Sequence, residues 1–128
     1  MISHVTLGTN DVPRAKSFYD PVMACIGYRE MSSSKGHVAY ARGEEQPPYL
    51  YVLRPYDREP AAPGNGWHCA FMVDDRATVR AFHETALANG GSDEGAPGPR
   101  PQYGPTYYGA YVRDPDGNKL QAVCYAAE

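Results

Sequence analysis

The sequence is poor in cysteine and carries no strong excess of charge of one sign. Its three cysteines, Cys25, Cys69 and Cys124, are too few and too widely spaced for a disulfide framework or a paired-cysteine metal site. We therefore expect buried thiols. The formal net charge is −3, with both signs scattered along the chain, so the sequence does not indicate a basic surface for nucleic acid.

Long apolar runs are also absent. The longest are the length of a strand, and none approaches the ~20 apolar residues that a membrane-spanning helix needs. The N-terminus lacks the basic stretch and apolar core of a secretory leader. The sequence therefore predicts a cytoplasmic protein without a membrane partner. What it does have is eleven tyrosines, a residue type that occurs in cores and also lines ligand pockets.

An internal repeat organises the chain. A shift of 64 positions places residues 4–27 on residues 68–91. The matched residues are His4 with His68, Asp11 with Asp75, Phe18 with Phe82, Ala24 with Ala88 and Gly27 with Gly91. Because the shift is half the chain, the repeat predicts two similar structural modules.

Each copy begins with a strand followed by a helix. Apolar segments 2–7 and 67–73 predict the strands, and Asn/Asp pairs after them predict capped helices that end at glycine. In the second copy, Gly90-Gly91 is expected to supply the left-handed stop. In the first, Pro21 lacks the backbone N–H that a helix interior uses, so we expect a break near Asp20.

Each helix is followed by short strands. Segments 27–31, 36–42 and 49–54 predict an antiparallel meander in the first half, and 107–113 and 119–125 predict its counterpart in the second. The Pro- and Gly-rich segment 92–106 is expected to be a long loop, either over a site or merely connecting.

The chain therefore divides into module one (residues 1–57), a linker (58–66) and module two (67–128), all within one domain of residues 1–128. The predicted fold class is α+β, with tandem βαβββ modules that form a curled mixed sheet around a cleft. Equivalent residues of the two first strands, His4 and His68, would approach each other across that cleft. Aligning Leu50 with Leu120 makes Tyr51 and Gln121 the equivalent residues of the two last strands.

Three segments of the sequence resemble one family. They are HVTLGTNDVPRAKSFY, GNGWHCAFMVDDRATVRAFHETALANGG and YVRDPDGNKLQAV. In this order, and with the repeat, they resemble the vicinal oxygen chelate superfamily of glyoxalases, extradiol dioxygenases, methylmalonyl-CoA epimerase and the fosfomycin and bleomycin resistance proteins. The resemblance implies glyoxalase-like βαβββ modules around a cleft, often a homodimer, and a divalent metal (Zn, Ni, Mn or Fe) held by the first and last strands.

On this resemblance, His4, His68 and Gln121 occupy metal-ligand positions, and Tyr51 stands at the fourth. Many members have a glutamate where this chain has Gln121. An amide gives a divalent ion no anionic partner, so metal binding would be weaker. An amide also cannot act as a general base on a substrate proton. The resemblance therefore leaves open whether Gln121 is a weak ligand, a hydrogen-bonding group for a substrate, or the remnant of a lost metal site.

Other residues are candidates for substrate binding, each with a structural alternative. Tyr51, Tyr40 and Tyr111 would line the cleft or face the opposite surface, since strand alternation does not decide which. Arg54 and Arg100 would clamp an anionic group or lie on the surface. Trp67 would form the rim or join the core.

Two functions from different classes follow. The first is a metal-dependent, glyoxalase-like lyase or isomerase acting on a small carbonyl compound, with the metal as Lewis acid and the catalytic residue unknown. The second is a metal-free binding or resistance protein that holds a small aromatic or cationic molecule in the tyrosine-rich cleft. An extradiol dioxygenase ranks below both, because its iron needs a carboxylate ligand.

Overall fold

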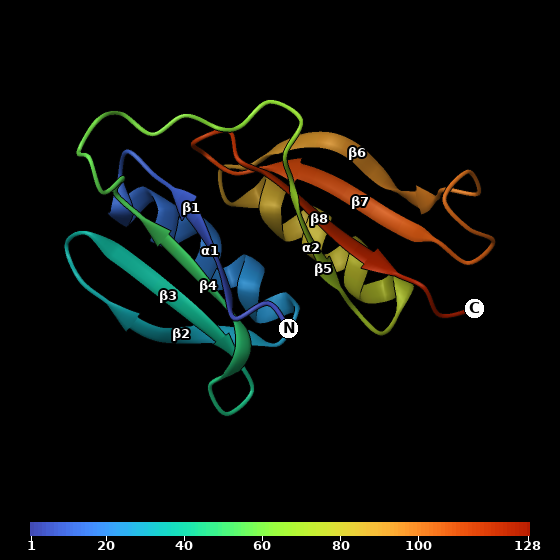
Figure 1. Ribbon diagram of the computed structural model, residues 1–128. Coiled ribbons are helices and arrows are strands. Elements are labelled where there is room, and N and C mark those ends of the chain that lie inside the picture. Colours follow the sequence, from blue (N-terminus) through green and yellow to red (C-terminus); the bar gives the residue numbers. More distant parts are fainter.

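The computed structural model describes residues 1–128 and contains two helices and eight strands (Figure 1). The first module comprises β1 (His4–Gly8), α1 (Val12–Cys25), β2 (Tyr28–Ser33), β3 (His37–Arg42) and β4 (Gln46–Leu53). The second comprises β5 (Cys69–Met72), α2 (Arg76–Ala88), β6 (Ser92–Pro99), β7 (Tyr108–Arg113) and β8 (Lys119–Cys124). The predicted α+β fold of tandem βαβββ modules is confirmed.

The two modules form two mixed sheets with the same topology. The strand order is β1-β4-β3-β2 in the first and β5-β8-β7-β6 in the second. In each, the first and last strands of the module pair in parallel, and the other neighbours pair antiparallel. No strand pairing joins the two sheets, so each module has its own sheet rather than half of one continuous sheet.

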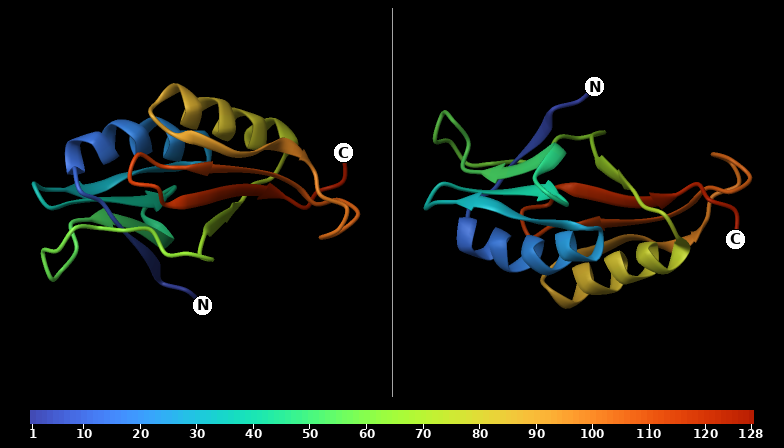
Figure 2. Two further views of the ribbon diagram at one scale, coloured as in Figure 1. Left: turned by 90° about the horizontal axis from the view of Figure 1, so that it is seen from above. Right: turned by 90° about the horizontal axis from the view of Figure 1, so that it is seen from below.

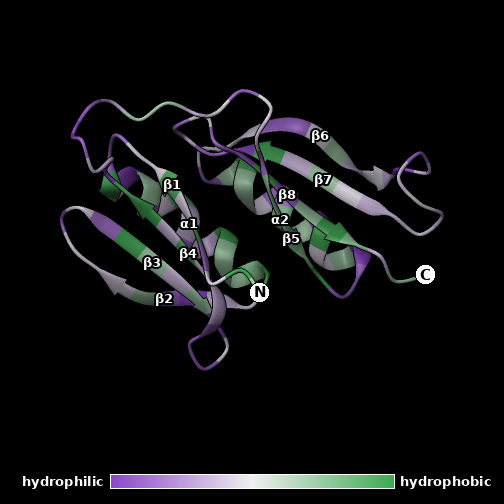
Figure 3. Cartoon of the chain, viewed as in Figure 1, coloured by the Kyte–Doolittle hydropathy of each residue, from purple (hydrophilic) through white to green (hydrophobic).

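Both helices cover the same side of the molecule. Seen along the sheets, α1 and α2 lie side by side on one face, while the linker and the N-terminus lie on the other (Figure 2). We call the sheet faces that no helix covers the open faces. The core lies between the helices and the sheets, where apolar residues such as Phe18, Val52, Phe82 and Leu120 are buried. Apolar segments occur in both helices and in strands of both sheets (Figure 3). Neither helix has the length and apolar character that crossing a bilayer requires.

The predicted helix ends are confirmed. The carboxylate of Asp11 accepts a hydrogen bond from the backbone N–H of Arg14, and that of Asp75 accepts one from Thr78. After the helices, Gly27 and Gly90 take positive φ angles of 81° and 96°. These angles strain any residue with a Cβ, which explains why glycine follows both helices.

The predicted break near Asp20 is wrong, because α1 runs without interruption through Pro21. Proline removes one hydrogen bond of the helix and costs about 3 kcal/mol relative to alanine. The same helix buries the side chains of Phe18, Tyr19, Val22 and Met23 completely. Each buried apolar side chain of this size contributes roughly 1.5–3 kcal/mol, so packing outweighs the local cost.

The prediction of a loop over 92–106 is wrong for its first half, which forms β6 along β7. This strand is at the edge of its sheet, where a missing proline N–H need not break a ladder. Its register with β7 shifts between Asp93 and Gly95 and again between Gly95 and Gly98, so Pro97 falls in an irregular stretch. Proline and glycine are therefore accommodated by irregular pairing rather than excluded from the sheet.

The turn between β7 and β8, DPDGN (114–118), joins the two modules. The carboxylate of Asp116 accepts hydrogen bonds from the Thr9 hydroxyl (2.5 Å), the Asn10 backbone N–H (2.9 Å) and the Arg14 guanidinium (2.7 Å). All three donors belong to the connection between β1 and α1 and the start of α1. The turn of module two is thereby tied to the opposite module.

Asp114 extends this connection into the interior. Its carboxylate accepts a hydrogen bond of 2.5 Å from the hydroxyl of Tyr19 in α1, and further ones from the backbone N–H groups of Asp116 and Asn118. Burial raises the pKa of Asp114 above its ordinary value, although these hydrogen bonds act in the opposite direction. The turn is therefore a structural contact between the modules as well as a hairpin.

Candidate functional site

The last strand of module two holds a buried amide at the position singled out from the sequence. Gln121 is 1% exposed, and its Oε1 lies 3.1 Å from Nε2 of His68, which directly precedes β5. Its Nε2 donates a hydrogen bond of 2.6 Å to the hydroxyl of Tyr107. Because an amide oxygen only accepts, Nε2 of His68 is the protonated nitrogen in this contact. Both polar atoms of the amide are therefore in use.

A glycine makes room for this amide. Gly109 in β7 lies beside Gln121, and a Cβ at that position would be 2.9 Å from the Gln121 Nε2 and 3.3 Å from the Ala122 carbonyl oxygen. The first distance is too short for any side chain without a shift. The small residue thus allows Gln121 to lie against the sheet and reach Tyr107.

Module one has a corresponding pair, in which a histidine packs against a tyrosine ring instead of bonding to an amide. The rings of His4 and Tyr51 lie 5.2 Å apart, edge to face, on the open face of the first sheet. The two residues come together because β1 and β4 pair in parallel. His4 is exposed, and its Nδ1 lies 3.0 Å from the hydroxyl of Ser3.

The two imidazoles belong to different sheets. His4 contacts Tyr51 and Ser3, while His68 contacts Gln121 and Tyr111. No hydrogen bond or ring contact links one imidazole to the other. One chain therefore presents two separate pairs, His4 with Tyr51 and His68 with Gln121. That the two histidines meet across a common cleft stays a prediction.

An aromatic cluster surrounds the second pair. The ring of Tyr111 lies 5.7 Å from that of His68, and Tyr107 lies 5.3 Å from both Tyr103 and Tyr125. Burial raises the pKa of Tyr111 to about 12, with Tyr107 contributing in the same direction, so the phenol stays protonated at neutral pH. We call Tyr103, Tyr107, Tyr111 and Tyr125 the tyrosine cluster.

The sequence interpretation named only one member of this cluster. Strand alternation could have identified two more members. Tyr107, just before β7, lies four residues before Tyr111, and Tyr125, just after β8, lies four residues after Gln121. Residues an even number apart on a strand share a face. Tyr103 lies in the turn before β7 and has no such signal.

Tyr40 lies on the other side of its sheet. It is buried under α1, and its hydroxyl donates a hydrogen bond of 2.6 Å to Asp20. The register of β3 and β4 places Ala39, not Tyr40, opposite Tyr51, whereas Tyr111 is opposite Gln121. The repeated letters AYAR and AYVR are thus offset by one residue between the modules, which reverses the face.

The remaining candidates differ in how free they are to bind a ligand. The guanidinium of Arg100 donates to the carbonyl oxygens of Ala96 (2.8 Å) and Gly98 (2.9 Å), so it holds its own segment together. Arg54 is exposed at the end of β4 and forms no ion pair. Trp67, next to His68, is 43% exposed and is therefore not a core residue.

Cysteine chemistry is not indicated at this site. All three cysteines are free, and burial raises the pKa of the Cys69 thiol to about 11. A thiol with such a pKa is almost entirely protonated at neutral pH and is a poor nucleophile.

The donor set does not fit a divalent metal ion. No three His, Cys, Asp or Glu side chains gather closely enough to hold one. The candidate donors are two imidazoles, an amide and a phenol, all neutral, and the amide is already bonded to His68 and Tyr107. A zinc or iron site of this type ordinarily includes an anionic ligand.

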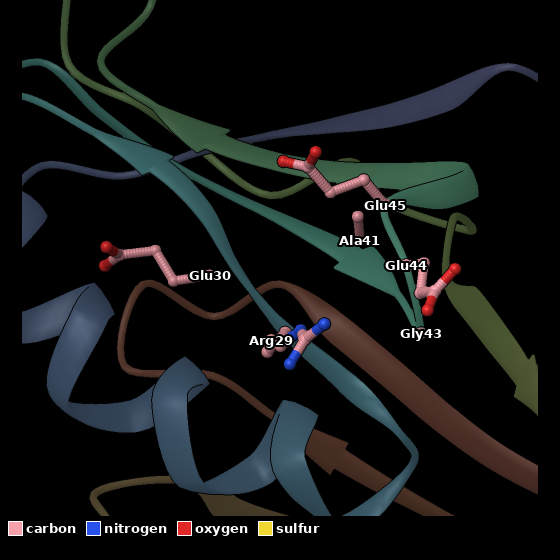
Figure 4. Close-up of a pocket in the computed structure, with 6 residues that line it drawn as sticks. All are labelled: Arg29, Glu30, Ala41, Gly43, Glu44 and Glu45. Carbon is pink, nitrogen blue, oxygen red and sulfur yellow. The ribbon is translucent and has the colours of Figure 1, made fainter.

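Two hollows of the chain lie away from His4, Tyr51, His68 and Gln121. One, of about 320 Å³, lies at the turn between β3 and β4 (Figure 4). It is lined by Arg29, Glu30, Ala41, Gly43, Glu44 and Glu45. The other, of about 560 Å³, lies between the modules, among residues that include Ile26, Tyr28, Met72 and Thr78.

The fold and the sequence match one family. The family described as "Glyoxalase/Bleomycin resistance protein/Dioxygenase superfamily" matches residues 1–122. No curated protein shows significant similarity to the chain.

Solved structures with the same fold include a glyoxalase/bleomycin resistance protein from Albidiferax ferrireducens T118. It is 35% identical, with a TM-score of 0.85 over 97% of this chain and 98% of that one. A glyoxalase-related enzyme from Fulvimarina pelagi is 21% identical, with a TM-score of 0.75 over 97% of this chain and 87% of that one. A lactoylglutathione lyase from Agrobacterium tumefaciens is 22% identical, with a TM-score of 0.67 over 97% and 92%. At these lower identities, the last two show the shared fold alone.

Proposed function

The chain belongs to the glyoxalase/bleomycin resistance protein/dioxygenase superfamily, and on that premise we propose that it binds a small molecule without a metal ion. The binding surface is the open face of the second sheet, around His68, Gln121 and the tyrosine cluster. This is the binding or resistance function that the sequence left as the second possibility.

One observation carries this proposal: the amide of Gln121 is bonded at both polar atoms. It accepts from His68 and donates to Tyr107, so the three side chains form a satisfied network in place of a ligand set for a cation. Of the three side chains only Gln121 is buried, so breaking either bond leaves a buried polar atom of the amide unpaired, which favours one orientation of this side chain. The amide bonds to the Tyr107 hydroxyl and so helps to fix the Tyr107 side chain, which in turn contacts Tyr103 and Tyr125.

The proposal includes a homodimer. On the open face of the second sheet, Tyr103 and Tyr125 are 62% and 52% exposed in one chain, whereas ligands usually bind in enclosed, concave sites. A second copy that places its first histidine pair, His4 and Tyr51, against this face would close it into a cleft. The free thiols of Cys25, Cys69 and Cys124 are consistent with the reducing cytoplasm, which we include as the expected location.

A metal-dependent lyase or isomerase is the second candidate function. Its support is the repeat itself, which puts a histidine in each module at an equivalent position, and the fold shared with a lactoylglutathione lyase. A divalent ion held by His4, His68 and Gln121 would act as a Lewis acid on vicinal oxygens. Neither Gln121 nor Tyr51 supplies the carboxylate base that proton abstraction requires.

Elemental analysis of protein purified without chelator separates the two functions. We expect no stoichiometric zinc, nickel, manganese or iron in the wild type or in His4→Ala, and a gain of metal in Gln121→Glu. Stoichiometric metal in the wild type that His4→Ala removes would favour the lyase and contradict our proposal. The absence of metal from all three proteins would leave the binding function standing and end the metal hypothesis.

Ligand binding itself is tested with a library of small molecules, using the melting temperature in the presence of EDTA. A ligand that binds only the folded state raises the melting temperature. We expect at least one compound whose effect survives EDTA and is lost in Tyr107→Ala. Tyr56→Ala is the matched control, because Tyr56 is fully exposed at the end of module one, just before the linker. If no compound protects the wild type, the proposed function fails.

A further inference from the structure

The two hydrogen bonds of the Gln121 amide run in one direction. Nε2 of His68 donates to the amide oxygen at 3.1 Å, and the amide nitrogen donates to the Tyr107 hydroxyl at 2.6 Å. An amide has one accepting end and one donating end, so it fixes the direction of both bonds. A carboxylate at this position would instead accept from both sides.

This direction determines what His68 offers to a ligand. A neutral imidazole that carries its proton on Nε2 has a lone pair on Nδ1, and that nitrogen accepts hydrogen bonds. His68 is exposed, and its one hydrogen bond within the chain is the bond from Nε2 to Gln121. Nδ1 is therefore free to accept a hydrogen bond from outside the chain.

The other end of the series, at Tyr107, is a donor. The Tyr107 oxygen accepts from Gln121. Burial is the largest cause of the raised pKa of Tyr111, and a hydrogen bond with Tyr107 is the next. A hydrogen bond that raises the pKa of a phenol is one that this phenol donates. The Tyr107 oxygen thus accepts twice, which uses both of its lone pairs, and its own proton is left to donate.

The free acceptor and the free donor lie near each other. His68 and Tyr107 bond to the same amide, and no side chain separates the Tyr107 ring from the sheet at Gly109, where a Cβ would be 3.5 Å from Cε1 of that ring. Tyr107 is half-buried, so part of the side chain reaches the surface. One small molecule can therefore contact both groups.

A cation is disfavoured beside this pair. Nζ of Lys119 lies 5.1 Å and Cζ of Arg100 lies 5.9 Å from the centre of the Tyr111 ring, so cations of the chain already occupy the positions that this ring offers to positive charge. An imidazole lone pair and a phenol proton recognise a partner through hydrogen bonds, without a charge on either side.

We propose that the ligand of this face is a neutral molecule that donates a hydrogen bond to Nδ1 of His68 through an O–H or N–H group and accepts one from the Tyr107 hydroxyl. This inference rests on the proposed function, since it names the ligand class of the same face. It also gives a reason for an amide at position 121, because a carboxylate would turn the Tyr107 proton away from the ligand.

NMR of the imidazole nitrogens tests the direction of the bonds without a ligand. At about pH 8.5, where an exposed imidazole is ordinarily neutral, we expect the proton of His68 on Nε2. A proton on Nδ1 would mean that the amide is turned round and that both bonds run the other way, which would overturn the inference.

Three neutral probes of similar shape test the two groups separately. Meta-acetylbenzyl alcohol has the donor and the acceptor, its methyl ether lacks the donor, and meta-ethylbenzyl alcohol lacks the carbonyl acceptor. In NMR titrations of the full chain with EDTA, the first should bind roughly three- to tenfold more tightly than each of the others, the effect of one neutral hydrogen bond.

The variants should remove these two preferences one at a time. His68→Phe should abolish the preference over the methyl ether and keep the preference over the ethyl compound, and Tyr107→Phe should do the reverse. Gln121→Glu, with EDTA present, should behave like Tyr107→Phe, because the carboxylate takes the proton of the Tyr107 hydroxyl as its own hydrogen bond.

His37→Phe and Tyr56→Phe are the matched controls in module one and should leave both preferences unchanged. The His37 ring bonds to Ser32 and Ser34, and Tyr56 is fully exposed. Equal affinities of the three probes, no binding of any probe, or the same losses in the controls would each overturn the inference. The proposed function survives these outcomes if library compounds still protect the wild type, whereas a library without any ligand removes both.

Discussion

Asp114 is a carboxylate that one module supplies and the other module binds. It accepts hydrogen bonds from Tyr19, Asp116 and Asn118, in a position where it is 4% exposed. An amide of the same shape would turn an NH₂ group toward donors that need an acceptor. At neutral pH, Asp114→Asn should therefore lower the free energy of unfolding by roughly 1–3 kcal/mol, measured by urea titration.

The raised pKa of Asp114 predicts that the free energy of unfolding depends on pH. Burial raises the pKa of Asp114 in the folded state above the ordinary value of 3.8, so the folded state binds the proton more tightly than the unfolded state does. The wild type should gain stability relative to Asp114→Asn as pH falls through the raised pKa toward 3.8, and lose that gain as pH rises. Exposed carboxylates with lowered pKa values, such as Asp75 and Asp93, are present in both proteins and cancel in the comparison. A difference that shrinks on acidification would contradict the sign.

Gly109 gives a second prediction at the scale of the residue. Gly109→Ala would bring a Cβ within 2.9 Å of the Gln121 amide and displace it from Tyr107 and His68. We expect a loss of roughly 1–3 kcal/mol in stability and a change in the imidazole NMR signals of His68. Gly36→Ala is the control, since its Cβ would meet only the Ser34 hydroxyl at 4.0 Å. Unchanged His68 signals in Gly109→Ala would show that Gly109 does not position the amide.

Helix α1 tests whether the burial of apolar side chains outweighs the cost of a proline in the helix interior. Pro21→Ala restores the hydrogen bond to the carbonyl of Ser17 and removes a steric clash in the helix interior. We expect a gain of roughly 1–3 kcal/mol in the free energy of unfolding. Pro13→Ala is the matched control, because Pro13 lies in the first turn, where no hydrogen bond is lost. A gain in Pro21→Ala no larger than that in Pro13→Ala would refute the explanation.

Elements with strong local signals were predictable from the sequence, and elements fixed by neighbours were not. The caps at Asp11 and Asp75 and the turn at Gly90 act within a few residues, so the sequence predicted them. The continuity of α1 through Pro21 and the pairing of β6 depend on burial and on β7, which no local pattern contains. The face of Tyr40 was undecidable because the register between β3 and β4 is a long-range property.

The whole molecule should be a dimer if its open faces form the binding site. In sedimentation experiments at micromolar concentration, we expect a species of twice the 14.0 kDa of one chain. Mixing His4→Ala with His68→Ala protein is the companion measurement, because a site built from two chains would regain one intact copy in the mixed dimer. A monomer at every concentration would contradict the shared cleft.

The four repeat-related residues of the candidate site could be predicted from the sequence, but the hydrogen bonds around them could not. The repeat identified His4, His68, Tyr51 and Gln121 as equivalent positions, and the structure pairs them two by two within the sheets. The bonds of Gln121 to Tyr107 and His68 depend on side-chain geometry that the sequence does not contain. The hydrogen bonds of Arg100 to the carbonyl oxygens of Ala96 and Gly98 likewise depend on the path of the segment before β7.

The contact between the modules is uneven along its length. At one end, Asp114 and Asp116 of the DPDGN turn accept hydrogen bonds from side chains of α1. At the other, a hollow of about 560 Å³ lies between the modules, with Tyr28 and Thr78 in its lining. The modules also meet away from that turn, where the Cys25 thiol donates to the Thr85 hydroxyl at 3.3 Å and the rings of Tyr28 and Phe71 lie 5.8 Å apart. Because the DPDGN turn holds the start of α1, it helps to fix the angle between the two open faces, and with that angle the placement of His4 relative to His68.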